Sequence, residues 1–163
     1  MNGLPPHVDA VVEWGIRASL LTYMAGAQDF EVETTGDATF SVSGGARMTG
    51  RVDEHGVLRL DGSVVLRAHL GALLVPLIDV RIDGRALTIA DPASSDGSDD
   101  ERLALVDLVP PEAEDSEPGT IVFGTRLAST ADALFMFNYL PGSDFDPLRI
   151  RVNASEKTPP VRD

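Results

Sequence analysis

Apolar residues near the start of the chain recur at the helical period. The pattern covers residues 8–24, with Tyr23 close to its end. Asp9 follows two prolines and is a suitable N-cap, and Gly26 is a suitable stop. This spacing predicts a short amphipathic helix. On that pattern alone, Tyr23 reads most simply as an aromatic residue of the core with a hydrogen-bonded hydroxyl.

From residue 30 onward the pattern changes to short apolar and β-branched segments separated by turn dipeptides. We predict strands at residues 30–34, 38–43, 47–52, 57–60, 63–69, 73–82, 85–89, 102–109, 120–127 and 146–152. Asp61-Gly62 and Asp83-Gly84 favour two-residue hairpins. Pro76 marks its segment as an edge strand or a bulge, because proline cannot donate to a sheet ladder.

A second short helix is expected near residues 129–137. Ser129 would cap its start, with Asp132 three residues on. The predicted fold is therefore mainly β, an antiparallel β-sandwich or barrel-like domain with two short α-helices. We expect one domain over residues 1–152 and a flexible polar tail over residues 153–163.

The charge of the chain restricts its partners. Acidic residues outnumber basic ones 26 to 13, so the formal net charge is -13. Nucleic acids and anionic membrane surfaces both attract clustered positive charge, so neither is an expected partner. There are no cysteines, which excludes disulfides, thiolate iron–sulfur clusters and cysteine nucleophiles.

The N-terminal residues carry neither a basic segment nor an apolar one, and no apolar run approaches the roughly 20 residues of a membrane span. We therefore expect a soluble, cytoplasmic protein. The chain also lacks nucleotide-binding glycine motifs and a serine-hydrolase elbow. His7, His55 and His69 fall on separate predicted elements, which argues against a histidine-rich zinc centre.

Tyr23 and His69 are the candidate site residues that chemistry favours. A phenol and an imidazole on two packed elements could hold a ferric haem. The phenolate oxygen would bind the iron, and the imidazole would hydrogen-bond that oxygen and stabilise its charge. By strand alternation, Arg67 shares a face with His69, so it either reaches a haem propionate or faces solvent.

Three stretches of the chain together resemble the HtaA domain, a haem-binding module of actinobacterial haem uptake. They are Trp14 to Tyr23, Gly62 to Gly71 followed by Asp79 to Ile82, and residues 133–142 followed by Asp146-Pro147. The order and spacing of these stretches carry the resemblance, which spans nearly the whole chain. It implies a β-sandwich-like domain with two short helices.

The resemblance also implies roles for individual residues. Tyr23 would be the axial ligand of the haem iron, His69 the partner of its oxygen, and Tyr139 a third member of the pocket. Phe135 would contribute an apolar wall against the porphyrin, or pack in the core. The cofactor implied is haem b, iron protoporphyrin IX.

The leading hypothesis is a protein that holds one ferric haem for handling or transfer inside the cell. One alternative is a haem enzyme, peroxidase- or catalase-like or biosynthetic, built on the same residues. The other is a cofactor-free binder or cyclase for another planar small molecule, with Tyr23, His69 and Tyr139 lining its cavity. The sequence leaves open whether the chain is an enzyme and whether it forms a homodimer.

Overall fold

The computed structural model of the chain describes residues 6–70, 73–83, 85–90, 102–110, 119–131 and 140–152. Within these ranges the chain forms twelve strands and one helix. Their bounds are β1 Asp9–Trp14, α1 Ala18–Ala25, β2 Glu31–Thr35, β3 Thr39–Ser41, β4 Gly45–Val52, β5 Leu58–Asp61, β6 Ser63–Ala68, β7 Leu73–Ile78, β8 Arg81–Ile82, β9 Ala86–Ala90, β10 Arg102–Val109, β11 Thr120–Leu127 and β12 Asp144–Val152.

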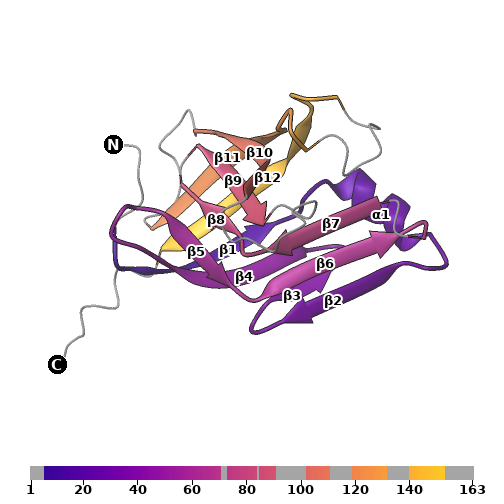
Figure 1. Ribbon diagram of the computed structural model, residues 1–163, viewed down its shortest axis with the longest axis horizontal. Coiled ribbons are helices and arrows are strands. Elements are labelled where there is room, and N and C mark those ends of the chain that lie inside the picture. The colour runs from indigo at the N-terminus through magenta and orange to yellow at the C-terminus, as the bar shows by residue number, and fades with distance from the viewer. Residues whose placement is uncertain are drawn as a thin grey trace.

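Eight strands form a closed antiparallel barrel in the order β1-β12-β11-β10-β9-β8-β5-β4, because β4 pairs back onto β1. The other edge of β4 pairs with two strands: the short β3 along its first residues and β5 along its last. A second sheet, with the order β2-β6-β7, extends to one side of the barrel, and α1 lies at its end (Figure 1). The predicted mainly β, antiparallel, barrel-like fold is confirmed.

The predicted helix over residues 8–24 is wrong in its first half. Residues 9–14 form β1, and the helix begins only at Ala18. Ala10, Val12 and Trp14 are each 3% exposed or less, so the buried positions alternate with a period of two. β1 closes the barrel by pairing with β12 on one edge and β4 on the other, and this tertiary pairing overrides the helical interpretation.

Two predicted local connections are also wrong, and both lie where the chain passes between the two sheets. Asp61-Gly62 is not a hairpin: it joins β5 of the barrel to β6 of the second sheet. Gly62 has a φ of 81°, and a Cβ at this position would come within 2.4 Å of the Thr35 carbonyl oxygen. The segment predicted as one strand over residues 73–82 divides into β7 and β8 at Asp79, whose φ is 53°.

The break at Asp79 is held by Arg102 of β10. The Arg102 guanidinium donates to the Asp79 carboxylate at 2.8 Å, to its carbonyl oxygen at 2.7 Å and to the Thr88 hydroxyl at 2.9 Å. Pro76, by contrast, lies as predicted on an edge strand, because within the described part of the chain β7 pairs with β6 alone. Among the described residues, no helix has the length and apolar character needed to traverse a bilayer.

Residues 129–131, the predicted start of the second helix, form a turn, and its residues 132–137 lie outside the described part of the chain. The predicted tail over residues 153–163 lies outside it as well.

Candidate functional site

The structure places the rings of Tyr23 and His69 beside each other. Their centroids are 5.1 Å apart and the ring planes are tilted by 35°. Tyr23 belongs to α1, and His69 follows the last residue of β6. The Tyr23 side chain is 59% exposed, so the simpler interpretation of this tyrosine as a core residue is wrong. The phenol is therefore accessible to a ligand from solvent.

The opposite side of α1 fixes the helix to the body of the protein. Leu20, Leu21 and Met24 are at most 1% exposed and belong to the hydrophobic core. α1 also contacts β6, the strand that leads to His69. Burying three large side chains on an eight-residue helix holds it in one orientation, with Tyr23 on the face directed to solvent.

The start of α1 is anchored to β12 by the residues of the first motif. The Trp14 indole N–H donates to the Asp146 carbonyl oxygen at 2.8 Å, and the Asp146 N–H donates to the Ile16 carbonyl oxygen at 2.9 Å. An Arg17 guanidinium N–H donates to the Asp144 carbonyl oxygen. Ile16 has a φ of 62°, which is rare for a β-branched residue, so these contacts hold a strained turn in place.

Asp146-Pro147 interrupts the regular ladder between β11 and β12. Phe123 pairs with Leu148, whereas Thr125 pairs with Phe145, so β12 carries one extra residue. Such a bulge turns backbone groups away from the ladder and accommodates a proline. The freed Asp146 carbonyl accepts both the Trp14 indole N–H and the Thr125 hydroxyl, each at 2.8 Å.

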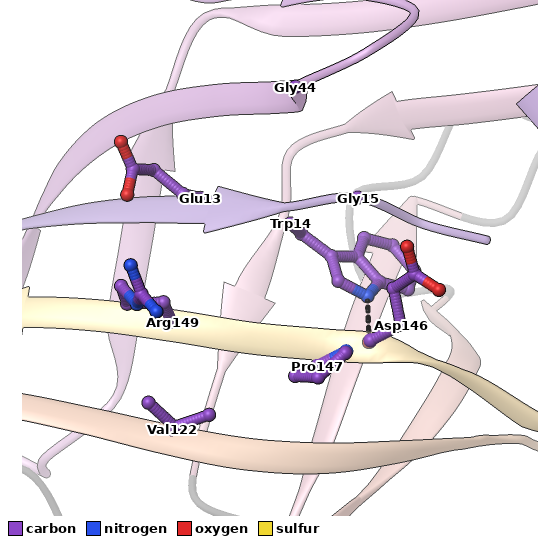
Figure 2. Close-up of a pocket in the computed structure, with 8 residues that line it drawn as sticks. All are labelled: Glu13, Trp14, Gly15, Gly44, Val122, Asp146, Pro147 and Arg149. Atoms are coloured by element: carbon purple, nitrogen blue, oxygen red, sulfur yellow. Dashed lines mark hydrogen bonds between the residues drawn. The ribbon is translucent and has the colours of Figure 1, made fainter. Parts of the chain in front are cut away.

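A surface hollow of about 380 Å³ lies over this junction, but it does not include the Tyr23–His69 pair. Figure 2 shows the Trp14 indole directed at the backbone of Asp146, with Glu13 and Arg149 on neighbouring strands. The hollow is lined by Glu13, Trp14, Gly15, Gly44, Val122, Asp146, Pro147 and Arg149. The Trp-Gly and Asp-Pro motifs thus have a structural role: they set the position of α1.

The His69 backbone is held by a residue that the sequence did not single out. His69 and Leu70 have φ values of 57° and 58°, a conformation that costs a non-glycine residue of order 1–3 kcal/mol. Both of their N–H groups donate to the Asp29 carboxylate, that of His69 at 2.9 Å. These bonds from Leu70 and His69 lower the pKa of Asp29 below its usual 3.8. No sequence pattern connects positions 29 and 69.

Arg67 lies on the face of the second sheet opposite the core. Its guanidinium donates to Glu33 on β2 at 3.0 Å, so a carboxylate already occupies it. Alternation along the sheet places an apolar group on this same face, and we call it the outer strip: Val65, Leu74, Pro76 and Ile78. Ile78 is 43% exposed, and Leu70, next to His69, is 96% exposed.

Tyr139 and Phe135 lie outside the described residues. The other two histidines, His7 and His55, do not belong to the pair: both line a separate hollow of about 570 Å³ with Asp53 and Arg59. Asp53 is occupied by backbone N–H groups of its own turn and by Arg59, which hold its pKa at about 2. In the described ranges, no group of three metal-ligating side chains forms.

A sequence model of the HtaA family, described as Htaa, matches residues 9–151. Three solved structures from Corynebacterium glutamicum share the fold. The N-terminal domain of HtaA has a TM-score of 0.68 and 19% identity, covering 91% of this chain and 98% of that one. The C-terminal domain of HtaA gives 0.62 and 20%, with coverages of 90% and 96%. The heme-binding protein HtaB gives 0.61 and 15%, with coverages of 89% and 93%. No curated protein matches the sequence.

Proposed function

Because the chain belongs to the HtaA family, we propose that it is a haem-binding protein that holds one ferric haem b, with the Tyr23 phenolate as the axial ligand and His69 as its partner. The observation that carries the proposal is the accessible phenol in ring contact with an imidazole, 5.1 Å between centroids. HtaB, one of the proteins of the same fold, is described as a heme-binding protein.

The chemistry of the pair suits ferric iron. A free phenol ionises near pH 10, so the iron must lower its pKa to bind it as phenolate at neutral pH. A neutral imidazole that donates its N–H to the phenolate oxygen stabilises the negative charge and so favours the ionised form that binds iron. The haem itself would supply the iron and the macrocycle, and the chain would supply the ligand, its hydrogen-bond donor and an apolar surface.

The described residues fit a macrocycle in a second respect. β6 joins the outer strip to His69, so apolar side chains lead up to the candidate ligand. Leu70, next to His69, is exposed, whereas Ile78 lies opposite Ser63 at the other end of β6. Val65 and Pro76 of the strip are themselves buried, so Leu70 is the exposed apolar residue beside the candidate ligand. A haem held by Tyr23 would remove the Leu70 side chain from water.

Titrating the purified full chain with haemin tests the proposal. Trp14 is the only tryptophan, so the fluorescence comes from one buried side chain, and its quenching by haem follows binding. We expect saturation at one haem per chain and a charge-transfer band typical of a high-spin ferric haem bound by tyrosinate. A colourless protein after haemin addition would contradict the proposal and favour the cofactor-free binder. Peroxide turnover well above that of free haemin would favour the haem enzyme.

Arg67 should contribute little to haem affinity. Because Arg67 is paired with Glu33 and both side chains are exposed to solvent, a haem propionate must compete with an existing partner. Exposed ion pairs contribute roughly 0.2–1 kcal/mol, so Arg67→Ala should raise the haemin dissociation constant less than about fivefold. Arg47→Ala, which removes an exposed arginine paired with Glu13 on the barrel, is the matched control. A tenfold loss confined to Arg67→Ala would instead indicate a propionate contact.

The intracellular role expected from the sequence, haem handling or transfer, stays a prediction. Fractionating cells that express the untagged chain and assaying each fraction for bound haem would test it.

A further inference from the structure

We propose that Asp29 is the positioning residue of the candidate haem site: its carboxylate fixes the His69 imidazole against Tyr23 by binding the backbone N–H groups of His69 and Leu70. The expected effect on haem affinity rests on the proposed function, whereas the placement of His69 concerns the protein without haem.

The two N–H groups form a small anion-binding concavity. His69 and Leu70 are successive residues with positive φ, so their N–H groups point to the same side of the chain. Asp29 places one carboxylate oxygen on each, Oδ1 on His69 and Oδ2 on Leu70. A bidentate contact of this kind fixes the direction of the turn as well as its position, and the direction of the His69 side chain follows from it.

The register of the second sheet explains why a side chain is needed here. The β2–β6 ladder ends at the pair Glu31–Arg67, and its continuation would place Asp29 opposite His69. The left-handed turn at His69 takes the chain out of the ladder, so backbone pairing cannot hold this residue. The Asp29 carboxylate replaces the missing ladder bonds and lets β6 end in a turn that aims His69 at α1.

Asp29 is also connected closely to the helix that carries Tyr23. The Ala27 N–H donates to the Met24 carbonyl oxygen at 3.0 Å, and the Phe30 N–H donates to the Ala27 carbonyl oxygen at 3.3 Å. Successive turns therefore join the end of α1 to the residues on both sides of Asp29. One short segment thus holds the phenol on one side and the imidazole on the other.

The test compares Asp29→Ala with Asp37→Ala, which removes an exposed aspartate from the β2–β3 turn. In the haem-free full chain, the NMR cross-peak between the Tyr23 and His69 rings should fall by more than half in Asp29→Ala and be unchanged in Asp37→Ala. With haemin, Asp29→Ala should raise the dissociation constant by about 10- to 100-fold, as is usual for residues that orient a metal's ligand sphere. The charge-transfer band should shift, because the hydrogen bond to the phenolate is altered.

Asp29→Asn keeps one acceptor oxygen and should fall between Asp29→Ala and the wild type. If Asp29→Ala does not fold, the cross-peak, the dissociation constant and the charge-transfer band are measured on Asp29→Asn. An unchanged ring cross-peak in the folded variants, or dissociation constants within twofold of the wild type, would overturn the proposal. A merely structural role would lower the thermal midpoint but leave both the cross-peak and the band in place. If the wild type binds no haemin, the proposed function fails, and the cross-peak still decides the role of Asp29.

Discussion

Tyr23→Phe should abolish tyrosinate ligation of ferric haem. The substitution removes only the phenol oxygen from a side chain that is 59% exposed, so the fold should be kept. Residues that merely orient a metal ligand are worth about 10- to 100-fold in affinity, so loss of the ligand itself should exceed about 100-fold. The charge-transfer band should disappear. Visible spectroscopy during haemin titration, with circular dichroism to verify folding, measures both effects.

The chain offers a sharp control for this experiment. It has two tyrosines and no cysteine, so Tyr139 is the only other source of a phenolate and no thiolate can replace it. Tyr139→Phe should keep the charge-transfer band, and the double variant should resemble Tyr23→Phe. If the band survives in Tyr23→Phe but vanishes in Tyr139→Phe, Tyr23 is not the ligand.

Much of the fold was predictable because most strands obey local rules. The β10 and β11 boundaries agree with the sequence prediction, and Pro76 was correctly placed at a sheet edge. The errors are at residues 9–14 and at the two passages between the sheets. At residues 9–14 and at Asp79 the deciding contacts are distant in sequence: β1 pairs with β12 and β4, and Arg102 holds the break at Asp79. Local periodicity contains no information about such partners.

The candidate site was predictable in its chemistry but not in its support. Tyr23 and His69 were named from residue type and motif, and the structure brings their rings together. Asp29 was missed, since an aspartate in a turn is an ordinary residue and its partners are some forty positions away. Its two partners, and Ile16 before α1, adopt backbone conformations that local rules disfavour. Departures of this kind concentrate where a structure holds functional groups in place.

The structural role of the first motif leads to the second large effect. Trp14→Ala should lower the free energy of unfolding by about 3–5 kcal/mol, the usual cost of deleting a large buried aromatic side chain. Trp14 is 2% exposed, and its loss also removes one of the two side-chain donors to the Asp146 carbonyl. Urea unfolding followed by circular dichroism measures the change, because the variant has no tryptophan fluorescence.

Val11→Ala is the matched control, because Val11 lies on the same strand between the buried residues Ala10 and Val12 but is only half-buried. It should cost less than about 1 kcal/mol, in keeping with its partial burial. Trp14→Phe keeps most of the apolar volume and loses the indole N–H, so it should cost about 1–2 kcal/mol. Because Trp14→Phe keeps the ring that packs in the core and removes only the bond to the Asp146 carbonyl, it should retain the haem charge-transfer band. Loss of that band in a fully folded Trp14→Phe protein would contradict this expectation and show that the indole N–H is needed to hold Tyr23 in place.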